Sequence, residues 1–170
     1  MLNKNGKYII GGRRKSRILA LNALYLVDLS NIGVEKAIEF IFLPKEYPEP
    51  IKRFTSFLVI ATLQNLNLID EIIRNNLKNW VLERLNVVDR NLLRLATCEM
   101  ICCPQTPVSV IINEAIEIAK MYSTKDSGKF INGVLDKVKT VRKNKELISK
   151  FIEPENAEEC KKILEEEGLL

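Results

Sequence analysis

The stretch PVSVIINEAIEIAKMY, residues 107–122, decides the fold class. Its apolar residues recur three, one, three, three, one and three positions apart, which is the spacing of one face of an α-helix. We expect Thr106 to cap this helix and Pro107 to occupy its first turn. The sequence therefore predicts an amphipathic helix whose buried positions are Val108, Ile111, Ile112, Ala115, Ile118, Ala119 and Tyr122.

Helical spacing of apolar residues continues on both sides of this stretch. It covers residues 13–29, 33–43, 54–63, 66–77, 92–101 and 124–140, whereas three prolines within residues 43–50 predict a loop. With 7 glycines and 6 prolines in 170 residues, the chain has few places for sharp turns. The sequence therefore predicts an all-α fold of about seven helices.

Composition excludes several classes of function. The chain has no histidine, so Ser-His-Asp and Cys-His catalysis and histidine-bound metals are excluded. The four cysteines, which lack CxxC spacing, indicate buried thiols in a reducing cytoplasm instead of disulfides or a zinc site. No apolar run approaches the roughly 20 residues that span a bilayer. We therefore expect a cytoplasmic protein that is not an enzyme and needs no cofactor, metal or membrane.

A basic cluster opens the first predicted helix. Arg13, Arg14, Lys15 and Arg17 place four positive charges in five positions at the helix end where the dipole is already positive, at a cost of about 0.3–1 kcal/mol each. An RNA phosphate backbone would explain the cluster. The alternative is a solvated charge run. Tyr25, two turns further on, is a candidate for stacking on an unpaired base, or else a core aromatic residue.

Four further features have a structural and a functional interpretation. Residues 123–126 (STKD) have the form of a capping box, in which the Ser123 hydroxyl accepts from the amide of Asp126. Gly133 inside a helix predicts close approach of a neighbouring helix. Arg90 and Arg94 share a helix face, which is either solvated or a protein contact. The paired carboxylates Glu114 and Glu117 are expected on a solvated face.

Three stretches resemble the NusB family of transcription antitermination factors. The first is ALY at 23–25, followed by Asp28. The second is WVLERL at 80–85, then VDR at 88–90 and LLRLA at 92–96, with Glu99 close behind. The third is VIINEAIEIAK at 110–120, then Ser127 and FINGVLD at 130–136. Together they span most of residues 13–140. Cys98 departs from the family, which often has Tyr there.

The resemblance implies two packed helical subdomains and binding of boxA RNA together with the ribosomal protein NusE. It also implies association with other Nus factors on RNA polymerase, which then reads through terminators, notably in ribosomal RNA operons. The RNA contacts that it implies are the basic cluster and the turn before the last core helix. With Tyr25 added, the candidate RNA-binding residues are Arg13, Arg14, Lys15, Arg17, Tyr25, Asp126, Ser127, Lys129 and Phe130. The candidate contacts to the protein partner are Asp89, Arg90 and Arg94.

We expect three regions: a flexible N-terminal arm at 1–12, the RNA-binding helical domain at 13–140, and a charged extension at 141–170. The proline-rich loop and the extension fall outside the resemblance. Two alternatives to antitermination are a helical protein–protein adaptor that does not bind RNA, and the RNA-binding domain of a larger RNA methyltransferase.

Overall fold

The computed structural model describes residues 11–151, and this part of the chain contains helices and no strand. The all-α prediction is therefore confirmed, with eight α-helices in place of about seven. The additional one is α8, a short helix in the expected extension. The elements are α1 (Gly12–Ser30), α2 (Val34–Phe42), α3 (Glu49–Gln64), α4 (Leu66–Asn76), η1 (Leu82–Arg84), α5 (Val87–Cys102), α6 (Val108–Tyr122), α7 (Ser127–Val138), η2 (Lys139–Lys143) and α8 (Lys145–Ser149), where η denotes a 3-10 helix.

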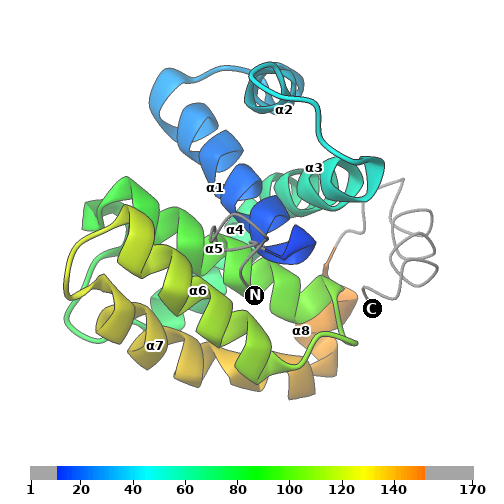
Figure 1. The fold of residues 1–170 in the computed structure, drawn as a ribbon. Coiled ribbons are helices and arrows are strands. Elements are labelled where there is room, and N and C mark those ends of the chain that lie inside the picture. Colours follow the sequence, from blue (N-terminus) through cyan, green and yellow to red (C-terminus); the bar gives the residue numbers. More distant parts are fainter. Residues whose placement is uncertain (1–10, 152–170) are drawn as a thin grey trace.

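The helices form two groups that share one core (Figure 1). One group consists of α1, α2 and α3, which pack against one another, and the other consists of α4 to α8 with η2. Within the second group, helix α5 forms most of the contact with the first, because it packs against α1 and α3 as well as against α4, α6 and α7. A helix enclosed in this way must be apolar on nearly all sides. Its buried apolar residues are Leu92, Leu93, Leu95, Ala96, Cys98, Met100, Ile101 and Cys102.

The predicted apolar face of α6 is largely confirmed. Ile111, Ile112, Ala115, Ile118 and Ala119 are buried in the core. Tyr122 is exposed at the last turn, so its prediction as a core residue is wrong.

Two predicted helix starts are wrong, each for its own reason. Helix α3 begins at Glu49 and carries Pro50 in its first turn, where a missing N–H costs no intrahelical bond, so residues 49–50 belong to a helix and not to the loop. Helix α6 begins at Val108, and the Thr106 side chain does not cap it. The buried Thr106 hydroxyl instead accepts a hydrogen bond from Arg13 Nη1 at 3.0 Å. A contact from α1 thus takes the hydroxyl that was expected to cap α6.

Residues 1–10 and 152–170 lie outside the described residues, and with them most of the expected arm, most of the extension, and Cys160. Cys98, Cys102 and Cys103 are buried free thiols, as predicted. Within residues 11–151, no single helix is long and apolar enough to cross a membrane. Only α3 and α4 taken together pass that test, and they are bent by 76° at their junction.

Candidate nucleic-acid interface

The basic cluster at the start of α1 is largely engaged inside the protein. Arg17 is 4% exposed, and its guanidinium donates two hydrogen bonds to the Glu99 carboxylate of α5. Arg14 donates to both carboxylate oxygens of Glu114 on α6, at 2.8 and 2.6 Å. These carboxylates explain why cations are tolerated at the positive end of α1. RNA phosphates are therefore not needed to explain the positions of Arg14 and Arg17. The Arg17 side chain is buried and is not presented to a ligand.

The other two cations of the cluster lie against aromatic rings. The Arg13 guanidinium is 5.4 Å from the centroid of the Phe54 ring, and burial lowers the pKa of this group, as does the nearby charge of Arg17. Lys15 Nζ lies 5.6 Å from the centroid of the Tyr47 ring. Both residues are half-buried, but Nε and Nη2 of the Arg13 guanidinium are themselves buried and have no hydrogen-bond partner among the described residues.

The predicted capping box before α7 is wrong, because a buried carboxylate recruits its residues. Ser127 is 2% exposed and its hydroxyl donates to Asp89 Oδ2 at 2.8 Å, while the Ser123 hydroxyl donates to Asp89 Oδ1 at 2.7 Å. Asn86 caps α5 by accepting from the amide of Asp89. Asp89 is thus a buried hydrogen-bond acceptor that links α5 to the start of α7. Neither Asp89 nor Ser127 faces a partner or RNA, which corrects both expectations, whereas Asp126 is exposed.

Arg90 and Arg94 form an ion-pair network between the two helix groups. Arg94 donates to both carboxylate oxygens of Asp70 on α4, at 2.8 Å each, and Arg90 Nη2 donates to Asp28 on α1 at 2.8 Å. Burial by itself would raise the pKa of Asp28, but hydrogen bonding and charge from Arg90, with the charge of Arg94, lower it overall. The face is therefore not a plain solvated one. Contact of these arginines with a protein partner stays a prediction.

Lys129 and Phe130 line a recess between α7 and the connection that follows α4, and we call this recess the aromatic groove. Its volume is about 310 Å³. Trp80 is 59% exposed, and its ring centroid lies 5.4 Å from that of Phe130 at an interplanar angle of 60°. Around these rings are three lysines and no carboxylate. The groove is lined by Leu77, Lys78, Trp80, Lys129, Phe130, Gly133, Val134 and Lys137.

Backbone conformation helps to form the aromatic groove. Asn79 has a φ of 60°, a left-handed conformation that asparagine tolerates better than most residues, directly before Trp80. Gly133 lines the groove, and a Cβ added to it would meet nothing within 4 Å. Its expected role in close helix packing is therefore wrong. Gly133 instead leaves the floor of the groove open.

Sequence reasoning missed Trp80, Lys78 and Lys137 as candidate site residues. One signal could have found Lys137, because Lys129, Gly133 and Lys137 are spaced four apart and so share a face of α7. Trp80 and Lys78 lie in an irregular connection. Periodicity gives no orientation there.

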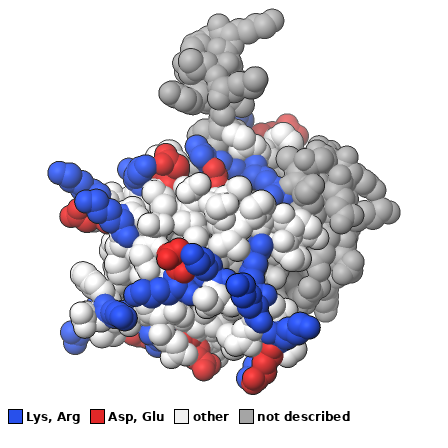
Figure 2. All heavy atoms as spheres, turned by 90° about the horizontal axis from the view of Figure 1, so that it is seen from below, with Lys and Arg blue, Asp and Glu red and all other residues white. Residues whose placement is uncertain are grey.

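Positive charge concentrates on the side of the molecule formed by α7, η2 and α8. Residues 125–150 hold eight Lys and Arg against three Asp and Glu, a net charge of +5. Figure 2 views the molecule from this lower side and shows basic side chains gathered on it. Lys139 and Lys150 pair with neighbouring carboxylates. Within the described part of the chain, no ion pair is formed by Lys78, Lys125, Lys129, Lys137, Lys143 or Lys145.

Tyr25 lies in a different groove from Lys129 and Phe130. It is 39% exposed and shares a recess of about 390 Å³ with Lys15, Tyr47 and Tyr122, between α1, α2 and the end of α6. The core alternative for Tyr25 is therefore wrong. The structure places the candidate RNA-binding residues on two surfaces.

These features define an all-helical protein with a basic, aromatic-lined groove, and comparisons assign its family. The model of the NusB family matches residues 14–140. The transcription antitermination protein NusB of Treponema denticola is 39% identical over 133 residues, covering 75% of this chain and 96% of the relative. That of Bacillus cereus is 42% identical over 132 residues with the same coverage. The chain belongs to the NusB family.

Solved structures of NusB proteins have the same fold. T. maritima NusB is 38% identical, with a TM-score of 0.72 over 81% of this chain and 96% of the other. A chain from a complex of the antitermination factors NusB and NusE with double-stranded RNA is 25% identical, with a TM-score of 0.71 over 78% of this chain and 99% of its own length.

Proposed function

We propose that this protein is a transcription antitermination factor that binds boxA-type RNA together with the ribosomal protein NusE. With other Nus factors it acts on RNA polymerase and promotes read-through in ribosomal RNA operons. The observation that carries this function is membership of the NusB family, whose curated members are named as antitermination proteins. A related structure contains NusB, NusE and RNA. The protein is not an enzyme.

The aromatic groove supplies the chemistry for RNA contact. Lys129, Lys137 and Lys78 are available to pair with phosphates, because none of them forms an ion pair among residues 11–151. Trp80 and Phe130 offer ring faces on which an unpaired base can stack, a contact worth about 1–3 kcal/mol. Asp126 is exposed one turn before Phe130, whose amide donates to its carbonyl. Single-stranded RNA with splayed bases is the form of RNA that such a surface suits.

The surface around Tyr25 provides a second proposed RNA contact. Lys15 and Tyr25 border one recess, and Arg13 and Arg14 precede Lys15 in the first turn of α1, where Arg14 is paired with Glu114. Arg17 and Ser127 are excluded from the proposal because both side chains are buried.

We place the protein in the cytoplasm. Three buried free thiols, at Cys98, Cys102 and Cys103, suit a reducing compartment. Burial raises the pKa of Cys102 well above its ordinary value, which keeps that thiol protonated and unreactive.

RNA titrations test the proposed function. The protein is titrated into labelled boxA-type RNA and a scrambled control, at two salt concentrations, with and without NusE. Tighter binding to boxA RNA, strengthened by NusE, is the expected result. Equal weak binding to both RNAs, unchanged by NusE, would instead favour the protein–protein adaptor. The methyltransferase alternative lacks support, because the curated relatives are NusB proteins covered over 96% of their length.

Charge variants test the aromatic groove within the same assay. Lys129→Ala with Lys137→Ala removes two phosphate contacts, so affinity falls and the salt dependence, as log K against log salt, becomes less steep by about 1.4. Lys36→Ala with Lys52→Ala, on α2 and α3, makes the same change in charge and leaves both quantities unchanged. Equal effects of the two pairs would contradict RNA contact at this groove.

A further inference from the structure

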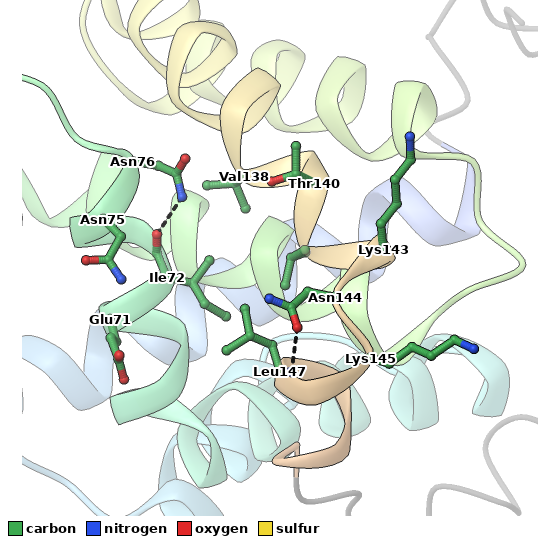
Figure 3. Close-up of a pocket in the computed structure, with 11 residues that line it drawn as sticks. Glu71, Ile72, Asn75, Asn76, Val138, Thr140, Lys143, Asn144, Lys145 and Leu147 are labelled. Carbon is green, nitrogen blue, oxygen red and sulfur yellow. Dashed lines mark hydrogen bonds between the residues drawn. The ribbon is translucent and has the colours of Figure 1, made fainter.

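A second recess, which we call the polar cleft, lies beside the aromatic groove and has a volume of about 570 Å³ (Figure 3). One wall is the last part of α4, and the other is formed by the end of α7, η2 and the start of α8. Its polar lining includes Asn75, Asn76, Thr140, Lys143, Asn144 and Lys145. Most of the second wall lies beyond residue 140, where the match to the NusB family model ends.

The polar cleft continues the aromatic groove along the seam between α4 and α7. On the α4 wall, Asn76 lines the cleft and the next residue, Leu77, lines the groove. On the α7 wall, Lys137 lines the groove and the next residue, Val138, lines the cleft. A strand that lies in the groove and follows this seam therefore enters the cleft.

The polar cleft presents donors that suit phosphate oxygens. Lys143 and Lys145 are exposed at its rim, where their side chains extend outward from the wall formed by η2 and α8 (Figure 3), and they form no ion pair within residues 11–151. Asn144 uses its Oδ1 to accept from the amide of Leu147, which leaves its side-chain NH2 group available. Asn75 is exposed on the opposite wall, which α4 forms (Figure 3). Glu71 is the one carboxylate in the lining, so the balance of charge favours an anion.

An arginine anchors the wall that carries these lysines. Arg142 donates hydrogen bonds to the carbonyls of Met100, Cys103 and Pro104, at 2.7, 2.8 and 3.2 Å, and so satisfies the C-terminal end of α5. Val141, the residue before Arg142, is buried in the core. The backbone that carries Lys143 and Lys145 is thus fixed to the core.

We propose that the polar cleft binds the phosphodiester backbone of the RNA strand that continues beyond the aromatic groove. The inference rests on the proposed function and extends it to residues outside the family match. Five lysines that form no ion pair with any residue of 11–151 lie along the seam, at 78, 129, 137, 143 and 145. A polyanion with a charge at every nucleotide matches that series. The occupant is therefore single-stranded RNA flanking the boxA element.

Binding of RNAs of two lengths tests this inference. The probes are boxA-type RNA, the same RNA extended by unpaired uridines at either the 5′ or the 3′ end, and scrambled RNA with the same extensions. The wild-type protein is expected to bind one of the extended RNAs roughly tenfold more tightly than the short one. Lys143→Ala with Lys145→Ala abolishes this gain, makes the salt dependence for the extended RNA less steep by about 1.4, and leaves binding of the short RNA unchanged.

Controls separate failure of the inference from failure of the proposed function. Lys36→Ala with Lys52→Ala keeps the gain, and circular dichroism of both pairs matches the wild type. No gain from either extension, or a gain that survives Lys143→Ala with Lys145→Ala, overturns the inference even when boxA is preferred over scrambled RNA. If boxA and scrambled RNA bind equally, but the extension still increases affinity in a way that Lys143→Ala with Lys145→Ala abolishes, the proposed function is overturned and the inference about the cleft is not. A poly-glutamate peptide that binds through these lysines, with no gain from RNA, assigns the cleft to an acidic protein and also overturns the inference.

Discussion

Arg17 and Lys129 carry the same charge, but their surroundings make Arg17 a buried structural residue and leave Lys129 available to a ligand. Arg17 is enclosed by carboxylates from α5 and α6, whereas Lys129 lies exposed with no carboxylate lining its groove. Glu99 is 82 positions away from Arg17 in the chain. A sequence pattern records charges that are neighbours along the chain and carries no sign of a partner from a distant helix. The cationic cluster was therefore predictable from sequence, and its neutralisation was not.

Arg17→Met is expected to destabilise the fold without altering RNA contact. It leaves the buried Glu99 carboxylate without its partner, which costs about 3–5 kcal/mol of unfolding free energy, measured by urea titration. The double variant Arg17→Met with Glu99→Met removes both charges and recovers most of that loss. RNA affinity of the folded fraction stays at the wild-type value. A loss below 1 kcal/mol would mean that the pair is solvated, contrary to its burial.

At the scale of the helices, periodicity predicted the segments well and their ends less well. The buried faces of α5 and α6 follow directly from the spacing of apolar residues. Caps depend on which polar groups compete for a hydroxyl, and that competition involves other helices. Ser123 had a local partner available in the amide of Asp126, but it donates to Asp89 of α5. The exposure of Gly133 could not be predicted either, because periodicity does not say whether a neighbouring helix covers a given face.

Gly133→Ala is expected to change stability and RNA binding in opposite directions. A methyl group at this exposed position of α7 meets no atom within 4 Å, and alanine favours the helix by about 0.5–1 kcal/mol. Unfolding free energy therefore rises, while RNA affinity falls because the methyl group projects into the aromatic groove. Thermal unfolding and RNA titration on one preparation measure both quantities. Asn132→Ala, on the neighbouring exposed position, is the matched control, and an equal loss of RNA affinity there would contradict a specific role for Gly133.

At the scale of the whole molecule, the resemblance to the NusB family predicted more of the structure than local sequence patterns did. The all-α fold and the NusB family were both predictable from the sequence, because the resembling stretches are spread over most of residues 13–140. The seam between α4 and α7 was not, since it is built from an irregular connection on one wall and from residues beyond the resemblance on the other. Surfaces that form between segments far apart in the chain require the tertiary structure.

The ion-pair network between the two helix groups makes stability depend on pH. The pKa of Asp28 in the folded state lies below its unfolded value of about 3.9, so its pairing with Arg90 contributes stability that is complete above that value. This contribution is lost as the pH falls through the folded pKa. Asp28→Asn is therefore expected to lower the unfolding free energy at pH 7, and the difference from wild type should shrink as the pH falls below about 3.9. Urea unfolding at several pH values measures it, and a constant difference would contradict this account.

Trp80 is the one tryptophan in the chain, and its ring lies in the aromatic groove, not in the core. Because the indole is already largely in contact with water, its fluorescence emission is relatively insensitive to unfolding. A nucleobase stacked on it would quench that emission. The protein therefore contains an intrinsic optical reporter of groove occupancy, and unlabelled RNA can be followed with the native chain.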